Sequence, residues 1–284
     1  MDYFHHIGGN SSIDPKLYDF MVQKKYPMKT LKAPNGDESY VIFVFDIYES
    51  DPLWPQIKEI ISEYDPKYDS VVNIIDTHFT EAELRNARWS WIGATFEQGD
   101  PMPRFKWIRE GLTFQLECQE CWIYRQITPF RISKEPRWGK NMFLRLVSVM
   151  EILTRPEVID VFHQQGFTGF EDWEVLIHKS GLPAQTVRQL IFKEVCPVEV
   201  ENKAQLIEMK CPACGRVRYK PHMRGTFQYK AADLEPIETD FMLMQERIGN
   251  GGVNWHEILV SNRVVQFILD QKWQGIRFKA IKLV

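Results

Sequence analysis

The first third of the chain alternates between short apolar runs and segments with apolar residues at helical spacing. Residues 40–48 (YVIFVFDIY) are β-branched and aromatic, which predicts a buried strand. Residues 52–63 have the spacing of an amphipathic helix, and residues 71–77 predict the next strand. Thr80 has the capping-box spacing to Glu83, which predicts a second helix. This order predicts an N-terminal α/β unit.

Two later segments have the pattern of short strands that meet at a tight turn. In each, alternating residues lead into a C-x-x-C sequence and out again, at Cys118–Cys121 and at Cys211–Cys214. Apolar spacing elsewhere predicts that helices pack against these strands. The helices expected along the whole chain cover 52–63, 80–88, 141–163, 184–193 and 261–271.

Proline and glycine gather at residues 99–103, which predicts a boundary near 100–105. We therefore expect an acidic α/β region over 1–104 and a second domain over 105–284, with one compact body as the alternative. Within the second region, residues 158–170 weakly resemble residues 264–276. Each copy predicts a short helix, a turn and an edge strand, as a duplicated module would have.

Composition narrows the class of protein. Apolar residues make up 44% of the 284 residues and charged residues 26%, as in soluble globular proteins. The net charge of −3 excludes a globally basic nucleic-acid coat. No apolar run is long enough to span a membrane, and the first residues lack the pattern of a secretory signal. We expect a cytoplasmic protein, whose cysteines are thiols or metal ligands rather than disulfides.

Two C-x-x-C pairs in one chain are the strongest chemical signal. Cys118, Cys121, Cys211 and Cys214 together supply the four thiolates of a tetrahedral Zn²⁺ site. A complete thiolate shell leaves no open position, so this zinc is expected to be structural. The fold expected is therefore α+β: an antiparallel sheet with two zinc-knuckle hairpins and flanking helices, plus the N-terminal α/β unit.

The two pairs are not equivalent. Gly215 follows the second pair and tolerates a positive φ, whereas the bulky Trp122 follows the first pair. One alternative is that one pair consists of buried thiols. A thioredoxin-like redox role is another, but it requires a C-x-x-C at a helix N-terminus, and both pairs are flanked by predicted strands.

Charge is unevenly distributed. Residues 37–76 contain ten acidic residues against Lys58 and Lys67, and residues 210–230 contain six basic residues and no acidic one. The plain interpretation of both segments is a solvated surface. The acidic segment could instead dock a basic protein. The basic segment could contact nucleic-acid phosphates through Arg216, Arg218 and Lys220, with Tyr219 and Phe227 as stacking residues.

The sequence offers no coherent catalytic set. Asp76 and His78 could form a catalytic pair at a strand end, although a histidine there more often packs against its neighbours or caps the strand end. The phosphate-binding, zinc-protease and serine-hydrolase motifs are absent from the sequence. We therefore expect no enzyme, no catalytic residue and no small-molecule substrate.

The cysteine motifs resemble the double-CXXCG motif family over roughly residues 105–284. The resemblance is carried by the first C-x-x-C, a long insert, Cys211-Pro-Ala-Cys-Gly215 and a closing segment over 259–278. Trp122 replaces the glycine of the first motif. Members of this family are immunity proteins paired with toxins delivered between bacterial cells.

The resemblance implies a binding function rather than catalysis. It predicts a protein that masks the active site of a cognate toxin, or an adjacent surface. The expected docking face lies in the acidic segment and includes Glu49, Asp51, Glu59 and Glu63, which suits a basic toxin. The alternative is a zinc-ribbon module that binds nucleic acid or regulates another protein.

Overall fold

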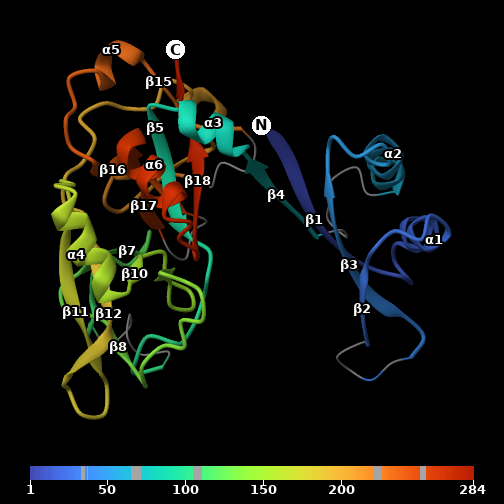
Figure 1. Ribbon diagram of the computed structural model, residues 1–284. Helices are drawn as coiled ribbons and strands as arrows, with labels where there is room; N and C mark the ends of the chain where they lie inside the picture. Colours follow the sequence, from blue (N-terminus) through green and yellow to red (C-terminus); the bar gives the residue numbers. More distant parts are fainter. Residues whose placement is uncertain (33–35, 37, 65–71, 105–110, 221–224, 250–253) are drawn as a thin grey trace. The chain divides into compact units, whose positions relative to one another are not determined.

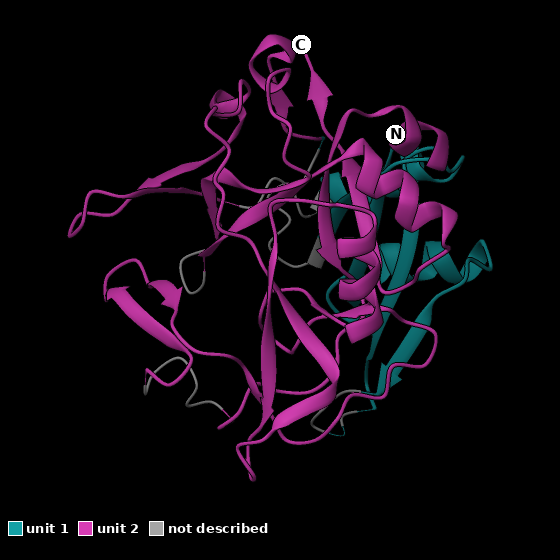
Figure 2. Cartoon of the chain, turned by 60° about the vertical axis from the view of Figure 1, so that its left-hand side comes forward, with its two compact units in different colours: residues 1–80, 222–225 teal, residues 81–221, 226–284 magenta. Residues whose placement is uncertain are grey.

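The described residues form helices and mostly antiparallel sheets, so the computed structural model confirms the predicted α+β class. The chain divides into two compact units. Figure 1 colours the chain along its sequence, and Figure 2 gives the two units different colours. Unit 1 comprises residues 1–80 and 222–225, and unit 2 comprises residues 81–221 and 226–284. The structure describes residues 1–32, 36, 38–64, 72–104, 111–220, 225–249 and 254–284.

Unit 1 is a four-stranded antiparallel sheet with two helices on one face. Its strand order is β2-β3-β1-β4, and its elements follow a β-α-β-β-α-β sequence, the split βαβ arrangement. Both helices contribute to one core with Ile7, Phe43 and Ile47 of the sheet. The elements are β1 (Asp2–Asn10), α1 (Pro15–Gln23), β2 (Lys29–Lys32), β3 (Val41–Tyr48), α2 (Trp54–Tyr64) and β4 (Val72–His78).

The predicted strands and helix of this unit are confirmed at β3, α2 and β4. The boundary between the units differs from the one expected near 100–105. Strand β5 (Trp89–Ala94) pairs with two strands of unit 2 and therefore fixes residues 81–104 there. The proline- and glycine-rich segment is a connection inside unit 2, where the Met102 amide donates to the Arg131 carbonyl.

Unit 2 contains two larger sheets. The six-stranded sheet has the order β13-β14-β16-β17-β5-β18, and the five-stranded sheet has the order β8-β11-β12-β10-β9. The hairpin around Cys118 and Cys121 forms its own two-stranded sheet, β6-β7. The strands are β6 (Phe114–Cys118), β7 (Ile123–Gln126), β8 (Arg131–Ile132), β9 (Phe143–Leu144), β10 (Leu153–Thr154), β11 (Glu171–Ile177), β12 (Pro183–Ile191), β13 (Glu208–Lys210), β14 (Val217–Tyr219), β15 (Gln228–Tyr229), β16 (Phe241–Gly249), β17 (Asn254–Ser261), β18 (Ile276–Ala280) and β19 (Lys282–Leu283).

The helices of unit 2 are few and short. They are α3 (Glu81–Asn86), α4 (Pro156–Gln164), α5 (Ala231–Leu234) and α6 (Asn262–Asp270), with a 3-10 turn at Lys203–Gln205. The helices predicted near 80–88 and over 261–271 are thus confirmed. None of the helices in the described parts of the chain is long and apolar enough to cross a membrane.

Two predicted helices are wrong. Most of 141–163 is irregular or forms β9 and β10, and only α4 is helical; 184–193 is almost entirely β12. Strand β12 has sheet neighbours on both sides and packs its apolar residues in the core. Its apolar residues Ala184, Val187, Leu190 and Ile191 lie at helical spacing in the sequence, so periodicity favours a helix there.

The weak repeat corresponds to two similar local structures. Helix α4 leads through a turn at Gly169 into β11, and α6 leads through a turn at Gly275 into β18. A Cβ atom on either glycine would lie 2.1 Å from a backbone carbonyl oxygen, that of Phe241 or of Phe143 respectively. Glycine is therefore required at both turns. Strand β18 is an edge strand as predicted, whereas β11 lies between β8 and β12.

Candidate metal centre

The structure brings the four cysteines of the two C-x-x-C pairs together. Their four sulfur atoms all lie within 4.8 Å of one another. The Sγ atoms of Cys118 and Cys211 are 3.8 Å apart, and those of Cys121 and Cys214 are 3.6 Å apart. In a tetrahedral site with Zn–S bonds of about 2.3 Å, neighbouring sulfurs are about 3.8 Å apart. The observed spacing therefore fits a tetrahedral tetrathiolate site.

Equivalent residues of the two knuckles face each other across this cluster. We call Cys118–Trp122 the first knuckle and Cys211–Gly215 the second knuckle. In the first, the Trp122 amide donates to the Cys118 carbonyl at 2.9 Å; in the second, the Gly215 amide donates to the Cys211 carbonyl at 3.0 Å. Trp122 and Gly215 both have positive φ, 55° and 74°. Trp122 thus adopts the same turn as the glycine, despite its bulky side chain.

Backbone amides are directed at the sulfurs. The Cys121 amide donates to the Cys118 sulfur and lowers the pKa of that thiol to about 7. The Cys214 amide likewise lowers the pKa of Cys211. Burial raises the pKa of Cys121 to about 12, because its thiolate would lie in an apolar environment. A bound dication would offset that effect, since a coordinating thiol is deprotonated outright.

Side chains from the six-stranded sheet hold the first knuckle in place. The Asn254 amide nitrogen donates to the carbonyls of Cys121 and Trp122 at 3.1 and 2.9 Å. Arg218 donates to the same Cys121 carbonyl at 2.6 Å, and Arg216 forms an ion pair with Glu117 at the same distance. These contacts fix the two knuckles relative to each other, as outer residues around metal ligands do.

The cluster is buried on one side. Cys121 and Cys211 are buried, Cys118 is half-buried and Cys214 is exposed. Four sulfur ligands complete a tetrahedral shell, so a metal here would have no open position for substrate. The fifth cysteine, Cys196, is buried elsewhere in the core of unit 2. All five are free thiols.

The acidic residues proposed for docking lie in unit 1, around α2. Glu49 accepts a hydrogen bond from the buried His5 at 2.9 Å, and Asp51 accepts from the Leu53 amide at 2.8 Å at the start of the helix. Glu63 is exposed and pairs with Lys16 at 3.1 Å. Glu59 is exposed on the helix. Two of the four acids therefore support local structure, and the other two are exposed, Glu63 as the partner of Lys16.

The aromatic residues considered for nucleic-acid stacking are not available for it. Tyr219 and Phe227 are only 7% and 8% exposed and belong to the core of unit 2, so this prediction is wrong. Arg216 and Arg218 form the contacts between the knuckles described above. Lys220 remains exposed. Asp76 and His78 lie 3.8 Å apart, and His78 bonds the Tyr48 hydroxyl and stacks on Phe4.

Sequence reasoning found the ligands but missed Asn254. Its position next to the knuckle follows from the pairing of β16 with β17, for which the sequence near residue 254 carries no local signal. Comparison with known protein families gives no matching family model, and comparison with curated proteins gives no match. The resemblance to the double-CXXCG family therefore rests on the motifs themselves.

Proposed function

We propose that this chain is a zinc-stabilised immunity protein, which binds a cognate bacterial toxin domain and masks its active site or an adjacent surface. The observation that carries the proposal is the convergence of both C-x-x-C knuckles into one four-sulfur cluster, although 93 residues separate their equivalent cysteines. That pairing of knuckles is what the double-CXXCG resemblance implies. The metal would be structural Zn²⁺, held by Cys118, Cys121, Cys211 and Cys214.

A binding role suits the chemistry of the cluster better than a catalytic one. Zinc enzymes keep one coordination position for water or substrate, whereas four thiolates fill the shell. Zinc held in this way contributes to folding, because the unfolded chain has no assembled site. A rigid binding surface also lowers the entropy lost when a partner is bound.

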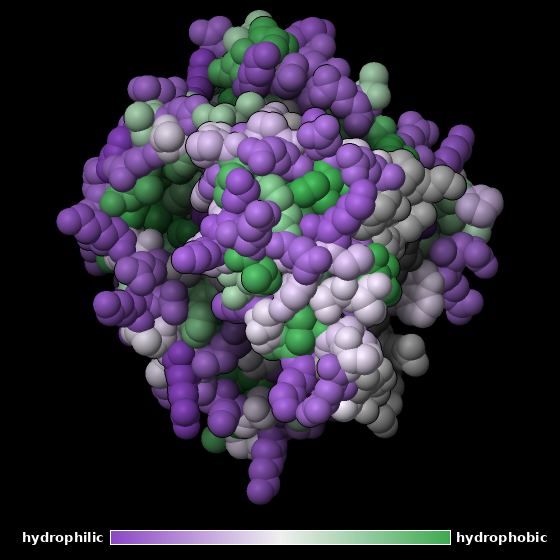
Figure 3. All heavy atoms as spheres, turned by 90° about the vertical axis from the view of Figure 1, so that its right-hand side faces the viewer, coloured by the Kyte–Doolittle hydropathy of each residue, from purple (hydrophilic) through white to green (hydrophobic). Residues whose placement is uncertain are grey.

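The docking face proposed for the toxin is the exposed acidic side of α2. Glu59 and Glu63 carry charge into solvent there, while Glu49 and Asp51 support the same segment from within. Figure 3 shows one face of the molecule, on which hydrophilic residues are interspersed with separate hydrophobic patches. Recognition through charge would favour a basic toxin surface.

The metal is tested on the purified full chain by elemental analysis. We expect about one zinc per chain, as one tetrahedral site requires. Removal of zinc with a chelator should cause a large loss of thermal stability, restored by added zinc. Protein that is fully folded and metal-free after purification without chelator would contradict the structural role.

The partner is tested by capturing the tagged chain from its own cells and identifying any protein bound in stoichiometric amount. The captured protein is then expressed with and without this chain, and surviving cells are counted. We expect the captured protein to be toxic alone and harmless together with this chain. Salt-sensitive nucleic acid without a protein partner would instead support the zinc-ribbon alternative.

The docking face is tested with the double variant Glu59→Lys/Glu63→Lys, which leaves the internal contacts of Glu49 and Asp51 intact. We expect toxin affinity to fall by at least about tenfold through lost charge complementarity. Glu157→Lys, an exposed acid on α4 in unit 2, is the matched control. Equal toxin affinity in the double variant and the control would place the interface elsewhere.

A further inference from the structure

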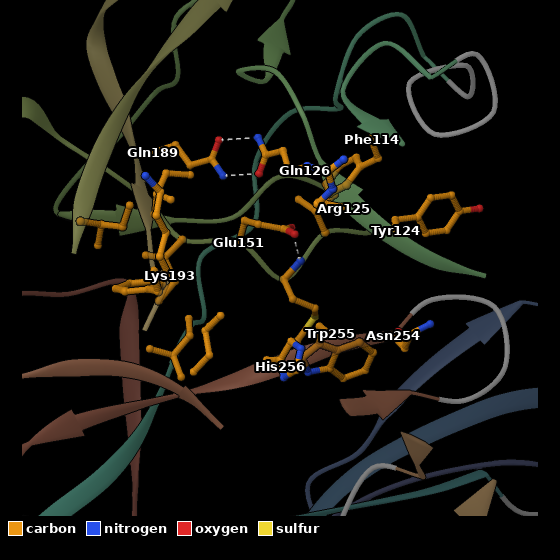
Figure 4. Close-up of a pocket in the computed structure, with 18 of the residues that line it drawn as sticks. Phe114, Tyr124, Arg125, Gln126, Glu151, Gln189, Lys193, Asn254, Trp255 and His256 are labelled. Atoms are coloured by element: carbon orange, nitrogen blue, oxygen red, sulfur yellow. Dashed lines mark hydrogen bonds between the residues drawn. The ribbon is translucent and has the colours of Figure 1, made fainter. Parts of the chain in front are cut away.

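Unit 2 contains a cavity of about 420 Å³ that the proposed function does not use. It lies between β12 of the five-stranded sheet and β17 of the six-stranded sheet, next to β7 of the first knuckle hairpin (Figure 4). Its volume is in the range of sites for small molecules. Five aromatic residues contribute to the lining: Phe114, Tyr124, Trp173, Phe192 and Trp255.

Most polar groups of the lining already have partners. The side-chain amides of Gln126 and Gln189 bond each other reciprocally at 2.9 and 2.7 Å, as Figure 4 shows. His256 donates through Nδ1 to the Met244 carbonyl at 2.7 Å, and burial lowers its pKa to about 4, so the ring is neutral. These groups therefore add no charge to the cavity.

Two of the three cationic residues of the lining pair with carboxylates outside it. Lys193 forms an ion pair with Glu171, 2.5 Å away, and Arg125 forms one with Glu117, 3.4 Å away. Arg247 donates to the Asn254 Oδ1 atom at 3.4 Å, and burial lowers its pKa, which the charges of Glu117 and Cys121 oppose. Lys193 and Arg125 thus have carboxylate partners, whereas Arg247 shares the charge of Glu117 with two other arginines.

Glu151 differs from Lys193 and Arg125, because its carboxylate has no partner of opposite charge among the described residues. Its Oε2 atom accepts a hydrogen bond from the Met150 amide at 3.1 Å. Within the described parts of the chain, no basic side chain pairs with the Glu151 carboxylate or interacts with its charge. Burial raises the pKa of this group, because the ionised form is poorly solvated. In Figure 4 the carboxylate lies in the middle of the cavity, above Trp255 and His256.

We propose that this cavity binds an organic cation, an ammonium or guanidinium group on an apolar stem. Its charge would pair with the Glu151 carboxylate, and its stem would contact the aromatic lining. A carboxylate with no internal counter-ion gains a charge-assisted hydrogen bond from such a ligand. The faces of tryptophan and tyrosine rings attract cations further. This site is independent of the toxin interface proposed on unit 1.

The test is a calorimetric titration of the zinc-loaded full chain with four probes of similar stem length. The probes are n-butylammonium, n-butylguanidinium, neutral 1-pentanol and anionic pentanoate. We expect at least one cation to bind about tenfold or more tightly than the alcohol, and the anion to bind least. A second arm uses capped peptides with a single lysine or arginine, to distinguish a free cation from a protein side chain as the source.

Glu151→Gln keeps the shape of the side chain and removes its charge. We expect this variant to lose about tenfold or more of the cation affinity and to bind the alcohol as before. Glu157→Gln, on α4 outside the cavity, is the matched control. The thermal stability of Glu151→Gln should equal or exceed that of the natural chain, since a poorly solvated charge without a basic partner is removed.

Two results would overturn the proposal. One is that no cationic probe, free or on a peptide, binds the natural chain more tightly than the alcohol does. The other is that Glu151→Gln keeps the full cation affinity. Since the first comparison uses the unaltered protein, it remains decisive even if the variant does not fold. Toxin binding is not measured here, so the two proposals fail or succeed separately.

Discussion

The two knuckles form the same backbone turn, although a different residue closes each one. Gly215 closes the second knuckle with a φ of 74°, and no atom lies within 4 Å of the Cβ position that a larger residue would have there. Trp122 closes the first with a φ of 55°, a conformation that bulky residues rarely adopt. The second knuckle is thus favoured by its own sequence, whereas the first needs support from its surroundings.

That support is visible around the first knuckle. Asn254 bonds two consecutive carbonyls of the turn, at Cys121 and Trp122. Arg218 bonds the first of these carbonyls as well. A strained conformation persists when its neighbours fix it more than once. The comparison teaches that a C-x-x-C motif without its glycine can still form a knuckle if the fold supplies the missing constraints.

The largest effect is expected from the ligands themselves, which both knuckles must supply. Cys121 is buried and Cys214 is exposed. Cys121→Ser and Cys214→Ser should each abolish stoichiometric zinc binding. The loss removes folding energy on the order of 10 kcal/mol, so unit 2 should unfold or melt far below the natural chain. Elemental analysis and thermal denaturation measure both consequences.

Cys196→Ala is the control for these variants, because this thiol is buried outside the cluster. It should retain full zinc content. A Cys214→Ser protein that binds zinc as well as the natural chain would show that only the buried side of the cluster matters. The equivalence of the two knuckles as ligand sources would then be wrong.

Asn254→Ala should give the next largest effect, confined to the first knuckle. The substitution removes two hydrogen bonds, which costs about 1–3 kcal/mol, and leaves the Cys121 carbonyl bonded to Arg218 alone. Urea denaturation of the zinc-loaded chain measures the change. If support of Trp122 is the reason, the loss should shrink when Trp122→Gly is introduced as well, because glycine needs no such support. Equal losses in both backgrounds would contradict this explanation.

Features that depend on residues close together in the sequence could be predicted, whereas features that depend on distant residues could not. The ligand set follows from residue type and spacing alone, and the buried strands and helix of unit 1 have clear local patterns. Trp122 was correctly singled out as a departure from the motif. The glycines at 169 and 275 also mark their turns in the sequence, since each approaches a carbonyl too closely for any side chain.

The failures have a common physical origin in long-range pairing. Strand β12 carries apolar residues at helical spacing, and its pairing with β11 and β10 overrides that local pattern. Tyr219 and Phe227 were considered for stacking because exposed and buried aromatics have the same sequence pattern. Asn254 contacts the first knuckle from 133 residues away, a distance over which a single sequence gives no signal.

Substituting the residue that closes each knuckle should give a smaller effect, which tests whether the two turns differ in backbone strain. Gly215→Ala should destabilise the zinc-loaded chain by about 1–2 kcal/mol, because the added Cβ meets no neighbour and only the left-handed backbone is penalised. Trp122→Gly should relieve similar strain and lose the contact between the Trp122 and Tyr124 rings, which lie 6.3 Å apart. Its net change should therefore be near zero. Urea denaturation of both variants checks the signs.

The smallest effect is expected from the ion pair that joins the knuckles at the surface. Arg216 and Glu117 have side chains 46% and 27% exposed, so Arg216→Gln should cost no more than about 1 kcal/mol. The loss should diminish further in molar salt, which screens exposed charges. Denaturation at low and high salt measures it, and Arg104→Gln, which removes the ion pair of Arg104 with Asp100, is the control. A salt-independent loss as large as that of Asn254→Ala would mean that the second knuckle also depends on outside support. In that case the contrast between a self-sufficient turn and a supported one would be wrong.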